Sequence, residues 1–324
     1  MGRFTIGFAV LVLVGATPAA PALAQAAPGT WTLKAPMPAP RGETAAIAVA
    51  GKLYAIGGSV LTVGAPFARS VPRTEEYDPA TDRWRVLAPM PVARDHLGLA
   101  VVNGKIYSFG GFTYSTHQGA GTDVFEYDPA SDAWRSRAPL KAARASTGAA
   151  VIGGKIHVIG GRGDPMTTVT THAVYDPATD TWTEAAPLPK ARDHMVLIEA
   201  EGKIHAIGGR LGASTDRTDQ HDIYDPASDS WSSGAPLKTP RSGLAGALYH
   251  GMILVLGGEL APNTFVENEG YDLKTKTWVT LAPMPEGRHG FGGDVIGPNA
   301  YFVGGSLKPG GGGITDQLIM FTLP

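Results

Sequence analysis

The feature that most constrains the fold is a pattern that recurs six times along the chain with fixed internal spacing. In each copy an arginine follows a tryptophan by ten residues, and a pair of glycines begins sixteen residues after the arginine. The tryptophans are Trp31, Trp84, Trp134, Trp182, Trp231 and Trp278; the arginines are Arg41, Arg94, Arg144, Arg192, Arg241 and Arg288; the pairs begin at Gly57, Gly110, Gly160, Gly208, Gly257 and Gly304. A period of about fifty residues predicts an array of similar supersecondary units.

Each copy of the pattern predicts four β-strands. An alternating apolar stretch such as 97–103 follows the arginine, and a Gly-Lys turn leads into a short β-rich run that ends on the glycine pair. After a loop of variable length, a third strand ends in a tyrosine, and an Asp-Pro turn precedes the tryptophan that opens the fourth strand. Glycine pairs at strand ends indicate positive φ or a close backbone approach.

These residues resemble the Kelch repeat family through the double glycine, the tyrosine and tryptophan seven residues apart, and the arginine after Ala-Pro-Met/Leu. The resemblance covers residues 31–321 and implies an all-β fold, a β-propeller in which each repeat forms one four-stranded blade. No tyrosine strand precedes Trp31, and no tryptophan strand follows Phe321. We therefore expect six blades, with the N-terminal strand completing the last blade and closing the ring.

The N-terminal segment predicts export. Arg3 precedes an apolar run, and Ala22-Leu23-Ala24 offers a cleavage site, as in a secretory signal peptide. We expect a signal peptide over 1–24 and one propeller domain over 25–324, a monomer in the periplasm or secreted, without a membrane span after cleavage. An uncleaved anchor is the alternative. The net charge of −2 gives no support to nucleic-acid binding, and the absence of cysteine excludes thiol nucleophiles and thiolate metal sites.

The six arginines and the variable loops are predicted to share one face of the ring. The distance from the glycine pair to the tyrosine varies from 14 to 20 residues, and binding sites favour variable loops on a rigid scaffold. The arginines form either an anion pocket at the channel mouth or structural pairs with nearby aspartates and carbonyls. Family resemblance favours the pocket most for Arg241-Ser242-Gly243. The candidate ligand-binding residues are Arg41, Arg94, Arg144, Arg192, Arg241, Arg288, Arg162, Arg210, Phe112 and Tyr114.

The residue two positions after the arginine differs in chemical type between copies, and in three of them it is Glu43, His96 or His194. They are candidates to converge as acid, base or metal ligands, or else they are interface residues bonded to the backbone. His157 and His205, inside second strands, are expected to be packed. The polar segment 216–222 lacks regular calcium-loop spacing, so a solvated loop is favoured over a cation site. No metal site or cofactor is predicted.

Two functions fit this sequence. The first is an exported binding module for a protein, a glycan or a small anionic ligand, taken at the channel mouth on the long-loop face. The alternative is a periplasmic mutarotase or epimerase acting on an acidic sugar, similar to the Kelch-type sialic-acid mutarotase, with Glu43 and a histidine as acid and base. Whether the chain is an enzyme stays open. Galactose-oxidase chemistry needs a cysteine, and the chain has none.

Overall fold

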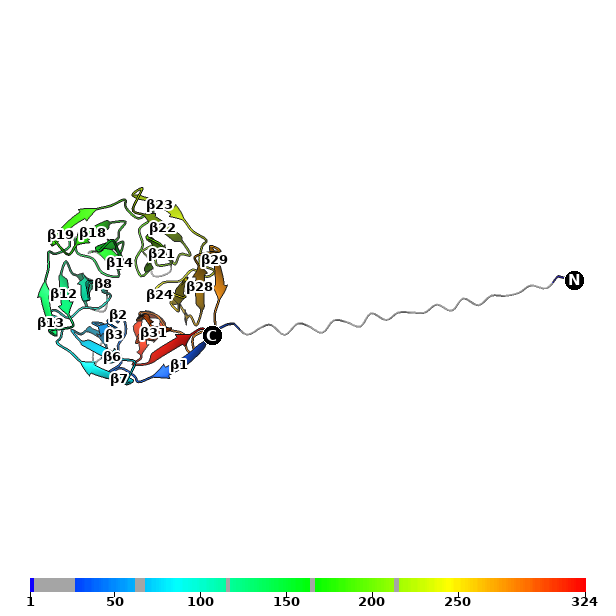
Figure 1. Cartoon of the computed structure of the whole chain (residues 1–324), viewed down its shortest axis with the longest axis horizontal. Helices are drawn as coiled ribbons and strands as arrows, with labels where there is room; N and C mark the ends of the chain where they lie inside the picture. The colour runs from blue at the N-terminus through cyan, green and yellow to red at the C-terminus, as the bar shows by residue number, and fades with distance from the viewer. Residues whose placement is uncertain (3–26, 62–67, 115–116, 164–166, 213–215) are drawn as a thin grey trace.

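The computed structural model describes residues 1–2, 27–61, 68–114, 117–163, 167–212 and 216–324. The predicted signal peptide, apart from residues 1–2, lies outside these ranges. In the described ranges, six four-stranded antiparallel sheets built from the successive repeats stand around a central axis (Figure 1). The prediction of an all-β propeller is confirmed. No helix in those ranges is long and apolar enough to cross a membrane.

Five blades run from an inner to an outer strand in the order of the sequence, and the sixth takes its outermost strand from the N-terminus. The innermost strands are β2 (Ala45–Val49), β8 (Gly98–Val102), β14 (Gly148–Ile152), β20 (Val196–Ala200), β24 (Ala245–Tyr249) and β30 (Gly292–Ile296). The second strands are β3 (Lys52–Ile56), β9 (Lys105–Phe109), β15 (Lys155–Ile159), β21 (Lys203–Ile207), β25 (Met252–Leu256) and β31 (Asn299–Val303). The third strands are β6 (Thr74–Asp78), β12 (Val124–Asp128), β18 (His172–Asp176), β22 (His221–Asp225), β28 (Asn268–Asp272) and β34 (Leu318–Thr322). The outermost strands are β7 (Arg83–Val86), β13 (Ala133–Ser136), β19 (Thr181–Glu184), β23 (Ser230–Ser233), β29 (Thr277–Thr280) and β1 (Thr30–Lys34).

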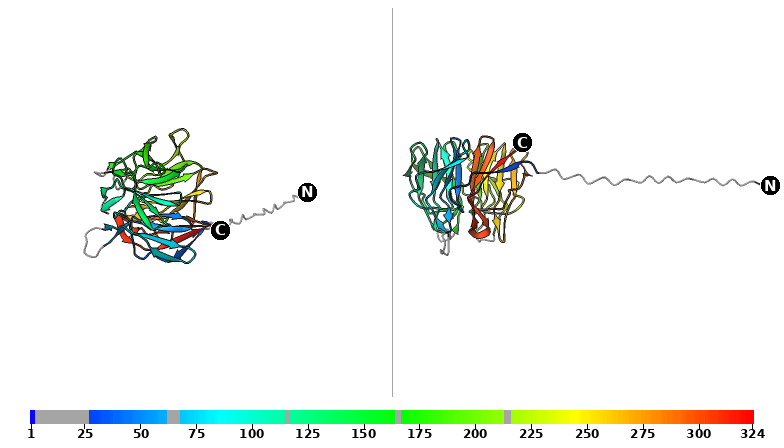
Figure 2. Two further views of the ribbon diagram at one scale, coloured as in Figure 1. Left: turned by 60° about the vertical axis from the view of Figure 1, so that its left-hand side comes forward. Right: turned by 90° about the horizontal axis from the view of Figure 1, so that it is seen from below.

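The variable loops after the glycine pairs carry short hairpins of their own. The first and second loops together form one small sheet, and the third, fifth and sixth loops each form a two-stranded hairpin. Their strands are β4 (Ser59–Val60), β5 (Arg69–Ser70), β10 (Phe112–Tyr114), β11 (Gln118–Ala120), β16 (Arg162–Gly163), β17 (Thr167–Thr168), β26 (Glu259–Leu260), β27 (Asn263–Thr264), β32 (Ser306–Lys308) and β33 (Gly312–Ile314), the last two joined by the 3₁₀ turn η1 (Pro309–Gly311). Figure 2 shows the ring edge-on, with loops projecting from one face.

The ring closes through the N-terminal strand. Strand β1 pairs antiparallel with β34, and Trp31 stands opposite Phe321 in that register. The expectation that residues far apart in the sequence share the last blade is thereby confirmed. Because β1 pairs with β34, the last blade has four strands like every other blade, and the ring has no incomplete sheet at its seam.

The tryptophan of each repeat links two neighbouring blades. The indole Nε1–H of Trp84 donates to the carbonyl oxygen of Ala35, 2.8 Å away in the preceding segment. Trp134, Trp182, Trp231, Trp278 and Trp31 make the equivalent bond at 2.9–3.0 Å. The apolar core follows the same plan, because buried residues form six clusters that each bring together two adjacent blades. The tryptophan therefore has a structural role in fixing the order of the blades.

The glycine pair permits the next blade to approach. The N–H of Gly111 donates to the carbonyl oxygen of Arg144 at 3.0 Å, and the other five pairs make the matching bond to the next arginine. A Cβ on Gly110 would lie 1.9 Å from that same carbonyl oxygen, and its φ is +58°. Only a residue without a side chain fits there, which explains why the glycines recur with the arginines.

Candidate functional site

Each repeat sends three residues to one end of the central cavity. The residue directly after the arginine forms a β-bridge with the residue directly after the glycine pair, as Asp193 does with Arg210 and Asp95 with Phe112. The residue two after the arginine lines the cavity and has φ between 48° and 70°. We call these six positions the inner ring: Glu43, His96, Ser146, His194, Gly243 and Gly290.

The inner ring is joined by main-chain hydrogen bonds from blade to blade. The N–H of Ser146 donates to the carbonyl oxygen of His96 at 2.9 Å, and the N–H of His194 donates to that of Ser146 at 3.2 Å. The remaining blades continue in the same way, and the N–H of Thr44 closes the circle on Gly290 at 3.2 Å. Because each backbone position is fixed by its neighbours, the inner-ring side chains project from a rigid frame.

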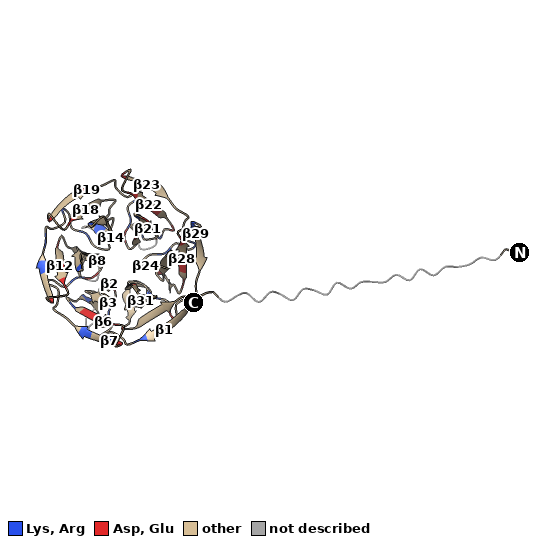
Figure 3. Cartoon of the chain, in the orientation of Figure 1, with Lys and Arg blue, Asp and Glu red and all other residues tan. Residues whose placement is uncertain are grey.

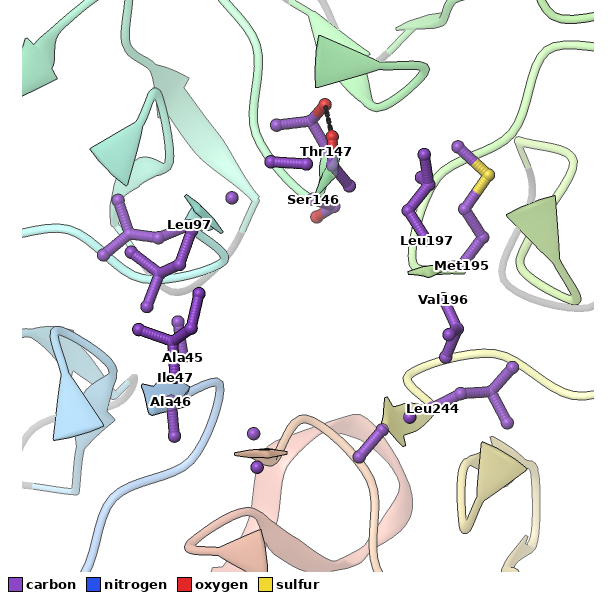
Figure 4. A pocket seen from close by; sticks show the side chains of 18 of the residues that line it. Ala45, Ala46, Ile47, Leu97, Ser146, Thr147, Met195, Val196, Leu197 and Leu244 are labelled. Atoms are coloured by element: carbon purple, nitrogen blue, oxygen red, sulfur yellow. Dashed lines mark hydrogen bonds between the residues drawn. The ribbon is translucent and has the colours of Figure 1, made fainter. Parts of the chain in front are cut away.

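The cavity inside the ring has a volume of about 400 Å³ and is walled by the innermost strands. Alkyl side chains such as Ile47, Leu97, Val196 and Leu244 face it from opposite blades (Figure 4). The ionisable side chains of the inner ring stand at the end where these strands begin. The cavity therefore combines an apolar wall with a polar end, a common composition for a ligand site.

Glu43 and His96 contact each other at that polar end. Oε2 of Glu43 lies 3.2 Å from Nε2 of His96, and Oδ1 of Asp95 lies 2.5 Å from Nδ1 of the same ring. Burial opposes protonation of His96, but the Glu43 and Asp95 carboxylates outweigh it and raise the pKa of the imidazole. Protonation of His96 at mildly acid pH is therefore favoured by its two carboxylate neighbours.

His194 has the same aspartate contact but different electrostatics. Its Nδ1 lies 2.5 Å from Oδ1 of Asp193, while Nε of Arg162 and Nε of Arg210 lie 2.9 and 3.1 Å from the same carboxylate. Burial and the Arg210 guanidinium hold the pKa of His194 well below its ordinary value. The two Arg-Asp-His segments thus present one imidazole that attracts a proton and one that stays neutral.

His117 and Phe112, from the loop after the second glycine pair, lie next to His96. The ring of His117 lies 4.9 Å from that of His96 and 5.4 Å from that of His194, measured between centroids. Phe112 is fully buried and packs edge-on against His96 and His117. Burial and the two neighbouring histidines lower the pKa of His117. Tyr114, predicted to bind ligand, is 62% exposed and does not line the cavity.

The opposite side of the polar end is built around Glu259. Its Oε1 accepts from Nη2 of Arg217 at 3.0 Å, and its Oε2 accepts from the N–H of Gly310 at 2.9 Å. Nδ1 of His289 lies 3.5 Å from Oε1 of Glu43, which connects this group to the first. Contacts with His289 and Arg217, with the Gly310 hydrogen bond, outweigh burial and lower the pKa of Glu259.

The two glycines of the inner ring make room for neighbouring side chains. A Cβ on Gly290 would meet the carboxylate of Glu43 at 2.3 Å, and a Cβ on Gly243 would meet Cβ of His289 at 3.2 Å. The missing side chains therefore admit Glu43 and His289.

The six repeat arginines lie away from the cavity lining. Each is buried and reaches toward its own blade: Arg192 pairs with Asp222 at 2.9 Å, Arg241 with Glu269 at 2.8 Å, and Arg41 with Glu75. Arg94 pairs with Asp123, while Arg144 and Arg288 bond carbonyl oxygens, Arg288 also bonding Oε1 of Gln317. This arrangement is the structural alternative given above. Ligand binding by these arginines stays a prediction that their placement does not favour.

Charged residues of both signs are spread around the ring (Figure 3). In the segment 216–222, Asp222 and Arg217 are engaged with Arg192 and Glu259. As expected, His157 and His205 are buried, with Nδ1 of each 2.8 Å from Nε2 of His172 and His221 respectively.

Glu43, His96 and His194, which the sequence suggests as converging residues, all line the cavity; their chemical role stays a prediction. Sequence reasoning missed Asp95 and Asp193, which orient the two histidines. The repeated Arg-Asp-His segment was the available signal. His117 belongs to a variable loop, and nothing in the repeat predicts where such a loop folds back.

The fold and the inner ring define this chain as a β-propeller built from sequence repeats. Models of the Kelch motif match residues 40–91, 93–141 and 143–189. Local similarity connects the chain to Kelch-like protein 15 of Danio rerio (44% identical over 68 residues, 21% of this chain and 11% of that protein) and of Homo sapiens (38% over 88 residues, 27% and 15%). Kelch-like protein terF of Aspergillus terreus is 40% identical over 99 residues, 29% of this chain and 21% of that protein. The chain therefore carries Kelch motifs within residues 40–189 and is similar there to Kelch-like proteins.

These matches span only a small part of the curated relatives, so they define the repeat and no shared activity. One solved structure, titled "Structure of YjhT", superposes with a TM-score of 0.74 over 87% of this chain and 95% of that chain, at 18% identity. At that identity the likeness concerns the fold alone.

Proposed function

We propose that this chain is a binding propeller that takes an anionic glycan or another small anionic ligand at the polar end of its central cavity. The observation that carries the proposal is the convergence of Glu43, His96 and His194 on one cavity whose remaining lining is mostly alkyl side chains and glycines, with the carboxylates of Glu199 and Asp294. Sugars present both hydroxyls and apolar faces, so this lining suits them.

In this proposal the anion is attracted by the guanidinium of Arg210, which contacts His194 and pairs with Asp193 although Arg210 is not among the residues that line the cavity. Its Nη2 lies 2.8 Å from Nε2 of His194 and 3.4 Å from Nε2 of His117. Against the effect of burial, Glu43 and Asp95 raise the pKa of His96, so this imidazole on the cavity wall adds a positive charge when it is protonated. Arg210, which directly follows the glycine pair at 208–209, thus takes the anion-binding role that the sequence suggests for the repeat arginines.

Ligand screening tests this proposal. Chelator-treated protein is titrated calorimetrically with sialic acid, glucuronic acid and galacturonic acid, and with glucose as the neutral control. We expect an acidic sugar to bind, glucose to bind more weakly, and Arg210→Gln to weaken acidic-sugar binding about tenfold, the effect of losing one charge-assisted hydrogen bond. The exposed Arg83→Ala variant is the matched control. Absence of binding by every acidic sugar at millimolar concentration overturns the proposal.

A second candidate function is mutarotation of an acidic sugar. It is favoured by the carboxylate of Glu43 and the imidazole of His96, 3.2 Å apart on the cavity wall, since the reaction needs an acid at the ring oxygen and a base at the anomeric hydroxyl. Magnetisation exchange between α and β anomers, followed by NMR, measures this. A rate unchanged by stoichiometric protein, or unaffected by Glu43→Gln, excludes it.

Export belongs to the same proposal and rests on the composition of residues 1–24. Expression of the full chain in a bacterium, followed by mass measurement of the periplasmic fraction, tests it. A mature protein beginning at Gln25 is expected; an uncleaved cytoplasmic chain contradicts it.

A further inference from the structure

We propose that His96, His117 and His194 form a binding site for a divalent first-row transition-metal ion such as Zn²⁺. One ring nitrogen from each histidine lies within 4.8 Å of the other two. The three come from separate parts of the chain: two inner-ring positions of different blades and the loop between β10 and β11. This inference goes beyond ligand binding by the propeller.

The aspartates beside two of these histidines orient them as ligands. Oδ1 of Asp95 and Oδ1 of Asp193 each lie 2.5 Å from Nδ1 of the following histidine. A carboxylate that accepts from Nδ1–H fixes the tautomer and leaves the Nε2 lone pair for a metal, an arrangement that recurs around metal-binding histidines. The Arg-Asp-His segment thus supplies a ligand together with its supporting carboxylate, twice.

The Nε2 atoms of His96 and His194 are the ring nitrogens that the two aspartates leave for a metal ion. Nε2 of His96 is buried without a hydrogen-bond donor, with Oε2 of Glu43 3.2 Å away, and the His96 side chain is only 3% exposed. Nε2 of His194 lies 3.4 Å from Oγ of Ser146 and 2.8 Å from Nη2 of Arg210, so a metal ion must displace the guanidinium there. A buried imidazole nitrogen without a hydrogen bond is costly unless something binds it, and a metal ion fulfils that requirement.

Binding requires a modest contraction of the site. Nitrogens at about 2.0–2.1 Å from a tetrahedral Zn²⁺ stand roughly 3.4 Å apart, so the three rings must approach by about 1 Å. Nη2 of Arg210, 2.8 Å from Nε2 of His194, occupies part of this space and must withdraw. Arg210 keeps its contact with Asp193 through Nε, which gives it an anchor when it does so.

The donor set indicates the class of ion. Imidazole nitrogens suit Zn²⁺, Cu²⁺, Ni²⁺ and Co²⁺ better than Ca²⁺ or Mg²⁺, which prefer oxygen. Three protein ligands leave one position open, as in zinc sites that bind water or an anion. His96 and His194 line the cavity, so that position is open toward the proposed ligand. The carboxylates of Glu43, Asp95 and Asp193 offset the added positive charge.

The experiment uses the full mature chain, stripped with a chelator and titrated with Zn²⁺ by calorimetry and with Co²⁺ by visible spectroscopy. We expect one equivalent to bind, with Co²⁺ bands typical of nitrogen ligands. His117→Asn and His194→Asn should each weaken binding at least 100-fold, and Asp95→Asn about tenfold through loss of orientation. Arg210→Gln should bind more tightly, because a competing cation is removed.

His250→Asn is the matched control. His117, His194 and His250 all have positive φ (61°, 55° and 49°), a conformation that asparagine accepts, so the three variants keep comparable backbones. Circular dichroism verifies folding, and if a variant unfolds, the Co²⁺ spectrum of the wild-type protein decides. No binding by wild-type protein at 100 µM metal, or equal binding by His117→Asn and wild type, overturns the inference. If metal does not bind but acidic sugars still bind in the presence of chelator, the inference fails and the proposed function holds without it.

Discussion

The indole Nε1–H of Trp31 donates to the carbonyl oxygen of Ala282, 2.9 Å away in space and 251 residues along the chain. This contact repeats, at the seam of the ring, the link that every other tryptophan makes to the preceding blade. The seam is therefore stabilised by the same bond as the other blade interfaces, together with the β1–β34 pairing.

Replacing one such tryptophan with phenylalanine isolates the hydrogen bond. Trp182→Phe keeps an aromatic ring against Tyr175 but leaves the carbonyl of Ala138 without its donor. We expect a loss of about 1 kcal/mol in the free energy of unfolding, measured in urea. Trp31→Phe should cost a similar amount, and a much larger loss at Trp31 would show that the seam is weaker than the other interfaces.

The repeat arginines are predicted to act on stability. Arg192→Ala leaves Asp222 buried without its cation, so we expect a loss of about 3–5 kcal/mol, the usual cost of breaking a buried ion pair. Chemical denaturation measures it, with exposed Arg83→Ala as the control. A variant of normal stability that no longer binds an acidic sugar would instead restore the anion-pocket interpretation.

Two glycines with positive φ separate backbone strain from steric overlap. Gly104 has φ +75° with no atom near its missing Cβ, so Gly104→Ala should cost about 1 kcal/mol through the left-handed conformation alone. Gly110→Ala adds an overlap with the carbonyl oxygen of Arg144 and should cost at least about twice as much. Equal melting temperatures for the two variants would refute the close approach of the blades.

Buried histidine pairs predict a loss of stability in acid. Nδ1 of His172 donates to the carbonyl of Ala186, so its Nε2 accepts from Nδ1 of His157, and both rings must be neutral in this pair. Burial, and then the neighbouring His172 imidazole, lowers the pKa of His157 to about 4.

The sign of the pH effect follows from this depression. Between pH 6.5 and about 4 the unfolded chain binds a proton at His157 that the folded chain does not, so stability is complete above pH 6.5 and falls as the pH is lowered. The drop is roughly 3 kcal/mol for this residue. Urea midpoints at several pH values for His157→Gln should show a shallower fall than wild type; an identical profile would contradict it.

The sequence predicts the frame of this protein better than its site. Fixed spacing specifies the strands, the closure by residues 30–34 and the inner-ring position of His96, because every copy obeys one geometry. The sequence does not decide whether the Arg192 side chain points into its own blade or toward the channel, because a buried guanidinium could find partners in either place. His117 reaches the site through a loop of individual length and sequence, where repetition carries no information.

The inner ring places six residues in one backbone conformation around the cavity, and four of them carry a side chain. Its backbone is left-handed at every position and is held by main-chain hydrogen bonds between blades, so four positions carry glutamate, histidine or serine in one backbone conformation, while Gly243 and Gly290 leave room for neighbouring side chains. A change of one residue in one repeat alters what the cavity presents and leaves the blades as they are. Chemistry can therefore diverge among such proteins one position at a time, without any change in architecture.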